Sequence, residues 1–224
     1  MDGSRPLFDW AFAWEILPHL LDALVVTVEA VAAGTVIALL LGLVWAILRR
    51  SSIATVRLAA HWLVELIRST PLLIQLYVLY FILPDAGITL PPLLTGVLGL
   101  GLHYSCYMAE VYRAGIEAVP RGQWDAAIAL GFSRAHTWRA IILPQAVARV
   151  VPALGNYVIA MFKDTPLLAA IAVSELLKTA KVIGAVHFRY LEPLTMVGVL
   201  FLILSLLASL GVRRLEKRYA VSHA

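Results

Sequence analysis

The sequence predicts an all-α protein that crosses a membrane several times. Of its 224 residues, 61% are hydrophobic and only 14% are charged, and the mean hydropathy is +0.86. Soluble domains are about 45–50% apolar and about 25% charged. Apolar stretches of about 20 residues, the length of a transmembrane helix, recur along the chain. These observations argue against a water-soluble enzyme and against a disordered chain.

Charge and cysteine content exclude further classes. Eighteen basic and fourteen acidic residues give a net charge of +4, a surplus too small to predict a nucleic-acid partner. Cys106 is the single cysteine, so the chain has neither an intramolecular disulfide nor a multi-cysteine metal site. The six histidines are scattered without the spacing of metal ligands. We therefore expect no metal site.

The first half of the chain contains three predicted spans. The first covers residues 24–48 and ends at a pair of arginines, the second covers 62–83 with an interruption at Pro71, and the third covers 93–114. Small residues spaced four apart let helices approach closely in lipid, and both the first and third spans carry such a stripe. The two predicted seams are Gly34, Ala38 and Gly42, and Gly101, Ser105 and Ala109.

The second half contains two more predicted spans, over residues 146–162 and 193–212. The stretch 117–144 is too charged to cross a membrane, and the segment 163–189 is of mixed polarity. Five spans place the two termini on opposite sides of the membrane.

The distribution of basic residues predicts which side is which. If the N-terminus lies outside, thirteen of the eighteen lysines and arginines fall on the inner face or its rim. This agrees with the excess of lysine and arginine that cytoplasmic loops carry. We therefore predict an extracytoplasmic, amphipathic segment over 1–22, a transmembrane domain over 23–213 and a cytoplasmic tail over 214–224.

The polar stretch 117–144 predicts a helix–turn–helix on the inner face. A short helix is expected from Gly122 to Leu130, because Gly131 suits the left-handed position that ends a helix and Ser133 suits the cap of the next one. Its apolar edge would consist of Trp124, Ile128 and Phe132. Such a knob suits docking into a groove of a soluble partner, and a helix lying on the membrane surface explains the pattern equally well.

Within this stretch, a motif resembles the EAA loop of ABC importer permeases. The pattern is Asp125-Ala-Ala, three residues, Gly131, nine residues, then Ile141-x-Leu-Pro144, with Asp125 in place of the usual glutamate. Three further segments are similar to the polar amino-acid permeases of that group, which serve substrates such as histidine, glutamate, glutamine, arginine and opines. These segments are 65–76, 107–123 and 161–167.

The resemblance implies a type I importer with the MetI-like fold, in the bacterial plasma (inner) membrane. Its implied partners are a second permease subunit, identical or related, cytoplasmic ABC ATPase subunits and an extracytoplasmic solute-binding protein. The short helix would be the coupling helix that contacts the ATPase. The contact residues carried over onto this sequence are Gln123, Asp125, Ala126, Ala127, Gly131, Leu143 and Pro144.

The sequence contains no G-x-x-x-x-G-K-[ST] motif, so ATP is expected to bind the partner subunit rather than this chain. We expect no cofactor and no catalytic residues here. Two other classes stay open. One is an intramembrane enzyme, for which no nucleophile and base are visible, and the other is a scaffold or sensor that docks a partner without moving solute.

Polar residues at membrane depth are the candidates for a substrate pathway. Thr70-Pro71 and Thr165-Pro166 resemble helix starts, whose free N–H groups suit a substrate carboxylate. Alternatively, Pro71 only kinks a span and Pro166 starts an external helix. The candidates are Glu29, Thr70, Pro71, Gln75, Asn156, Lys163, Asp164 and Thr165.

Two charged pairs and two short segments complete the predictions. Glu65 with Arg68, and Glu110 with Arg113, are spaced to form ion pairs that stiffen the inner rim or act in a gate.

Segments 187–195 and 8–14 resemble the ectoine/hydroxyectoine permeases. The expected substrate is therefore a polar amino acid or a related zwitterion, with the compatible solute ectoine as one possibility.

Overall fold

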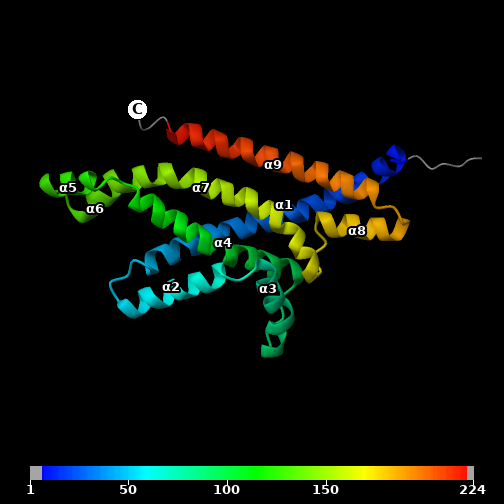
Figure 1. Ribbon diagram of the computed structural model, residues 1–224, viewed down its shortest axis with the longest axis horizontal. Coiled ribbons are helices and arrows are strands. Elements are labelled where there is room, and N and C mark those ends of the chain that lie inside the picture. The colour runs from blue at the N-terminus through cyan, green and yellow to red at the C-terminus, as the bar shows by residue number, and fades with distance from the viewer. Residues whose placement is uncertain (1–6, 221–224) are drawn as a thin grey trace, which may run out of the picture.

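The computed structural model describes residues 7–220, and within this range the chain is helical and contains no strand. Residues 1–6 of the predicted N-terminal segment and residues 221–224 of the predicted cytoplasmic tail lie outside the described residues. The α-helices are α1 Trp10–Leu48, α2 Ala54–Arg68, α3 Leu72–Tyr77, α4 Pro92–Glu117, α5 Arg121–Ala129, α6 Arg134–His136, α7 Leu143–Asp164, α8 Leu176–His187 and α9 Leu191–Ala220. In Figure 1, α5 and α6 lie at one end of the molecule and α8 lies near the other.

Helix α1 is continuous over 39 residues. At 1.5 Å per residue it is about 58 Å long, well beyond the roughly 30 Å of a bilayer's hydrocarbon core. Residues 10–22, which the sequence predicts as a segment apart from the first span, are therefore the first turns of the same helix. The Asp9 carboxylate caps it by accepting hydrogen bonds from the N–H groups of Ala11 at 3.0 Å and Phe12 at 3.2 Å.

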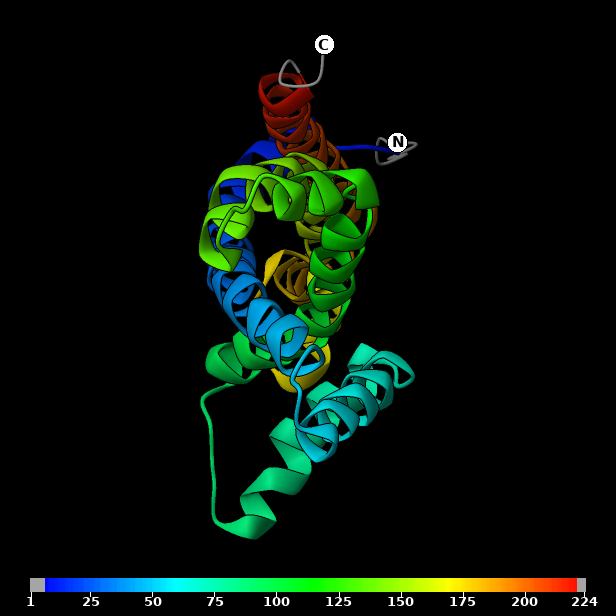
Figure 2. The ribbon, with the colours of Figure 1, turned by 90° about the vertical axis from the view of Figure 1, so that its left-hand side faces the viewer.

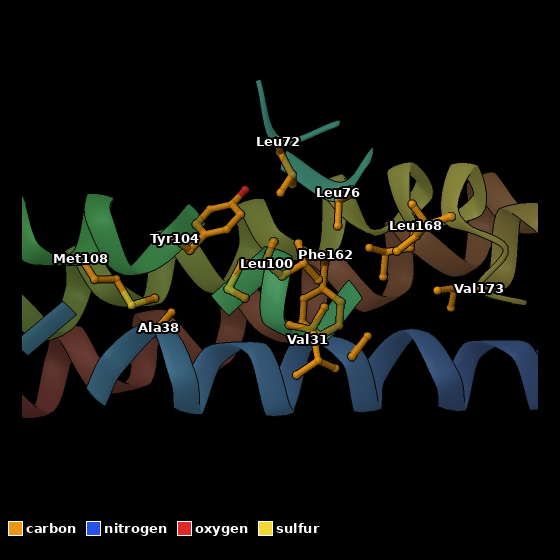
Figure 3. Packing of buried hydrophobic residues seen from close by; sticks show 14 residues of the cluster. Val31, Ala38, Leu72, Leu76, Leu100, Tyr104, Met108, Phe162, Leu168 and Val173 are labelled. Carbon is orange, nitrogen blue, oxygen red and sulfur yellow. The ribbon is translucent and has the colours of Figure 1, made fainter. Parts of the chain in front are cut away.

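Helices α1 and α4 pack along the two predicted seams of small residues, which the structure confirms. All six seam residues are buried. A Cβ atom added to Gly42 would lie 2.9 Å from the Ser105 carbonyl oxygen, so the two backbones are in contact there. The main hydrophobic core lies along this seam, where Val31, Leu100 and Phe162 meet (Figure 3).

The predicted second span is not one continuous helix. Helices α2 and α3 meet at 102° across Ser69–Pro71, and Pro71 has extended backbone angles of φ −62° and ψ 139°. In Figure 2 this pair and the turns after it project from the ring formed by the other helices. Proline disfavours helical geometry in the residue before it, which explains the break.

Length and hydropathy qualify three continuous helical stretches of the described chain as spans. They are Trp10–Leu48, Arg134–Ile171 and Leu191–Arg218, and the bent α2–α3 pair is a fourth if it counts as one span. Helix α4 is 26 residues long but does not qualify by hydropathy, and half of its residues are buried against the rest of the protein. Five spans and an external N-terminus therefore stay predictions.

The second predicted half-helix also differs from expectation. Helix α7 passes directly into a 3₁₀ segment, Thr165–Ile171, and no side chain caps it. The buried Thr165 hydroxyl donates backwards to the Phe162 carbonyl oxygen at 2.8 Å. Thr165 therefore does not mark an open helix N-terminus that could receive a carboxylate.

The end of the molecule near α8 is tied together by polar contacts. Buried Glu175 caps α8 by accepting hydrogen bonds from the Leu177 and Lys178 N–H groups. Burial raises the pKa of its carboxyl, although these two hydrogen bonds act to lower it. Arg189 forms ion pairs with Asp9 at 3.1 Å and with Glu192. The Phe12 N–H, assisted by Arg189, holds the pKa of Asp9 below its ordinary value.

Candidate functional site

The stretch 117–144 forms the helix–turn–helix that the sequence predicts. Gly131 has a left-handed φ of +71°, its N–H donates to Ile128, and the Phe132 N–H donates to Ala127, each at 3.0 Å. This pair of bonds is the Schellman arrangement that ends a helix. The Ser133 hydroxyl accepts from the His136 N–H at 3.3 Å and caps α6, as predicted.

The predicted coupling residues divide into exposed and buried members. Gln123, Asp125, Ala126 and Gly131 are exposed on α5 and its turn, and Ala127 is only 1% exposed. Leu143 and Pro144 are exposed at the start of α7, away from α5 in sequence. A partner seated on α5 would therefore meet the exposed members, because Ala127 is covered by this chain's own residues.

The predicted apolar edge of α5 borders a cavity of about 580 Å³, which Trp124, Ile128 and Phe132 line. Ile128 is 75% exposed and Phe132 is 42% exposed. Trp124 packs edge-on against Trp138, with ring centres 5.3 Å apart. Trp138 belongs to the π-helical segment Thr137–Ile142 that leads into α7. The tryptophan pair therefore fastens α5 to the start of α7.

An ion-pair network lies near the same end, on α1, α2 and α4. The predicted pairs Glu65–Arg68 and Glu110–Arg113 are confirmed, at 3.0 Å and 2.6 Å. Glu110 also binds Arg49 from the end of α1, and Arg68 lies 3.6 Å from it. One carboxylate thus faces three arginines from three helices. The sequence reveals the pairs on one helix but not the link to Arg49.

Gln75 organises the break between α2 and α3. Its amide nitrogen donates to the Ile67 carbonyl at 2.7 Å and to the Thr70 hydroxyl at 2.8 Å, and its amide oxygen lies 3.1 Å from the His103 ring nitrogen Nδ1. The structure thus brings together two predicted candidates, Thr70 and Gln75, and adds His103 from α4.

Asp164 lies at the end of α7 and accepts a hydrogen bond from the Tyr104 hydroxyl at 2.7 Å. Tyr157, Tyr107 and His103 continue this polar aromatic face, with successive ring centres 5.7 Å and 5.2 Å apart. The residues of α4 on this face are not among the predicted candidates. The signal for them is the polar run 103–107 in the middle of an apolar span.

The remaining candidates take no part in these hydrogen bonds. Glu29, Asn156 and Lys163 are exposed, and within residues 7–220 they form no hydrogen bond with the other candidates. Pro71 is exposed at the break, and Thr165 is buried beside Asp164. The structure therefore gathers Thr70, Gln75 and Asp164 around α4 and leaves the others dispersed.

Comparisons with known proteins agree with this architecture. Residues 14–221 match the family described as binding-protein-dependent transport system inner membrane component. The probable amino-acid ABC transporter permease protein y4tG of Sinorhizobium fredii is 49% identical over 203 residues, covering 91% of this chain and 88% of the relative. The glutamine transport system permease protein GlnP of Escherichia coli K12 is 34% identical over 216 residues, covering 96% and 99%.

A crystal structure of an amino acid ABC transporter is 34% identical with a TM-score of 0.91, and the match covers 95% of this chain and 100% of that one. The all-α, MetI-like type I importer fold is thereby confirmed. The relatives are permease subunits of the inner membrane, and in ABC transporters ATP is hydrolysed by a separate subunit, so this chain is not an enzyme. The chain belongs to the family of binding-protein-dependent transport system inner membrane components, as a permease subunit of an ABC importer.

Proposed function

We propose that this chain moves a polar amino acid into the cell by alternating access. Cytoplasmic ATPase subunits drive the movement, an extracytoplasmic binding protein delivers the substrate, and a second permease completes the pathway. The relatives named for amino-acid and glutamine transport support this substrate class. The observation that carries the proposal is the exposed helix α5, fastened to α7 in a chain whose fold matches an amino acid ABC transporter.

In this mechanism α5 is the coupling helix. A partner that moves α5 would move Trp124, and Trp124 would pass the displacement through Trp138 to the start of α7. Helix α7 packs on α4 and α9, so the displacement reaches the helices of the bundle. The carboxylate of Asp125 lies on the exposed side of α5, where a basic residue of the ATPase could pair with it.

The substrate pathway is proposed along the face of α4 that carries His103 and Tyr104. Asp164 supplies a carboxylate that suits the ammonium group of a zwitterion, and the Gln75 amide and Thr70 hydroxyl supply neutral polar groups nearby. Polar and ionisable residues at membrane depth are expensive unless they have a function or a partner. The ectoine assignment is not part of the proposal, because the relatives do not support it.

The coupling role predicts that Ala126→Arg uncouples the transporter. A bulky, unpaired cation buried in the contact with the ATPase weakens it by several kcal/mol, so we expect ATP hydrolysis stimulated by substrate to fall at least five-fold. The measurement is ATP hydrolysis by the complete importer, with its binding protein, in liposomes. The control is Ala54→Arg, at an exposed alanine that is also predicted to lie on the cytoplasmic side of the membrane. Equal stimulation in both variants would contradict the coupling role.

The pathway role predicts that Asp164→Asn impairs uptake. Asparagine still accepts the Tyr104 hydrogen bond but lacks the charge. A hydrogen bond to a charged group contributes about 1.5–3 kcal/mol, so uptake at low substrate concentration should fall about ten-fold or more. Radiolabelled amino-acid uptake into the same liposomes measures the effect. The exposed Asp85→Asn variant should transport normally, and unchanged uptake by Asp164→Asn would remove Asp164 from the pathway.

A further inference from the structure

A groove of about 760 Å³ lies between α1, α4 and α7, near the end that carries α5. Leu43 and Ile47 of α1, Ile116 of α4 and Val147 of α7 form its walls. Its volume falls within the range of about 300–1,000 Å³ typical of small-molecule sites. The groove shares Trp138 with the α5 contact but lies apart from Gln75, His103 and Asp164.

The walls of the groove are apolar and uncovered. Ile47 is 61% exposed, Leu43 is 47% exposed and Val147 is 40% exposed. No residue of the described part of the chain fills this space. Contiguous exposed apolar surface in a membrane protein is covered by lipid tails or by another protein.

The mouth of the groove is polar and basic. Arg50, Ser51 and Ser52 line it. The Arg50 guanidinium carbon lies 5.8 Å from the centre of the Trp138 ring, and within residues 7–220 Arg50 forms no ion pair. Arg57 adds a second positive charge to the turn, because it donates to the Ser51 carbonyl oxygen at 2.9 Å.

The nearby acidic group does not cancel this charge. Glu117 borders a neighbouring cavity with Arg50, but its carboxylate is already paired with Arg113 at 2.6 Å. Arg49, which precedes Arg50, is likewise paired, with Glu110. A positive mouth thus stands above an apolar groove, and an occupant that complements both has a negative head and an apolar tail.

We propose that this groove binds an anionic phospholipid of the inner leaflet. Its phosphate pairs with Arg50 and accepts from the hydroxyls of Ser51 and Ser52, while an acyl chain lies against Ile47 and Val147. Basic pockets between transmembrane helices on the cytoplasmic side are suited to anionic lipid head groups. The proposal requires that the α5 end face the cytoplasm, but it is independent of the transported substrate.

The lipid would join the end of α1 to the segment that holds Trp138. That segment also carries the contact with Trp124 and hence with α5. An occupied groove therefore steadies the joint through which α5 is proposed to act.

The test is a lipid titration of the purified, delipidated importer, followed by native mass spectrometry. We expect phosphatidylglycerol to bind more tightly than phosphatidylcholine with the same acyl chains. Arg50→Gln should weaken phosphatidylglycerol binding about five-fold, since each basic residue near an anionic lipid contributes about that factor. Arg214→Gln removes an exposed arginine of α9 and should leave it unchanged.

A second pair of variants tests the apolar part of the groove. Val147→Trp should fill the space and lower retention of the lipid, whereas Leu210→Trp on the exposed side of α9 should not. Three results would overturn the proposal: equal affinity for the two lipids, equal binding by wild type and Arg50→Gln, or a photocrosslink from position 147 that traps the ATPase or the second permease. The experiment measures lipid binding and not transport, so it can contradict the lipid site without contradicting the proposed function, and the reverse.

Discussion

Replacing Gly42 by valine is expected to destabilise the protein strongly and to lower its folded yield. A Cβ atom at this position would lie 2.9 Å from the Ser105 carbonyl oxygen and 3.0 Å from the Met108 Cβ atom. Both are backbone or near-backbone atoms that cannot rotate away, so α1 and α4 have to separate. Overpacking of this kind typically costs about 1–3 kcal/mol and sometimes more, and we expect the upper end because the seam runs through the main core.

The measurement is the yield and thermal stability of the detergent-solubilised protein, followed by size-exclusion chromatography. Gly198→Val is the matched control, because a Cβ atom on that α9 residue meets nothing within 4 Å. A helical valine at Gly198 should be tolerated. Equal stability of the two valine variants would contradict the inference that the α1 and α4 backbones are in contact at Gly42.

Replacing Glu110 by glutamine is expected to loosen the junction of α1, α2 and α4. The change removes the carboxylate that joins Arg49, Arg68 and Arg113. Arg68 keeps Glu65 and Arg113 keeps Glu117, but within the described residues Arg49 is left without a carboxylate partner. Removing one partner of a buried ion pair costs about 3–5 kcal/mol. Because the Glu110 side chain is 19% exposed, solvent screening reduces this, and we expect roughly 2 kcal/mol.

Thermal unfolding at low and high salt measures this effect. Glu117→Gln is the control, since within residues 7–220 Glu117 pairs with Arg113 alone and its side chain is 53% exposed. Exposed pairs contribute about 0–1 kcal/mol, so the control should unfold near the wild-type temperature. A Glu110→Gln protein that matched Glu117→Gln would show that the network does not hold the three helices together.

The sequence predicts the helical fold and its principal seam because both depend on short-range patterns. Gly34 and Gly42 mark the face of α1 that meets α4, and the structure confirms it. The 102° bend at Pro71 is different. Proline predicts that the helix breaks, but the direction of α3 depends on how Leu72 and Leu76 pack in the core, which is tertiary information.

The same distinction holds for the functional residues. Gly131 and Ser133 act on neighbours within a few positions, so the turn after α5 can be predicted from sequence. The bond from Tyr104 to Asp164 joins residues 60 positions apart, and the sequence gives no reason to pair them. Thr165 differs from the predicted cap of a half-helix, because its hydroxyl donates backwards to the Phe162 carbonyl oxygen.

The length of α1 has a consequence for how the protein sits in lipid. Even at a tilt of about 40°, the steepest commonly observed, a helix of 39 residues spans about 45 Å along the membrane normal. The excess over the hydrocarbon layer has to stand among head groups or in water. The exposed indole rings of Trp10 and Trp14 suit the interface at that depth. The depth and tilt at which this subunit sits should therefore depend on bilayer thickness in any reconstituted preparation.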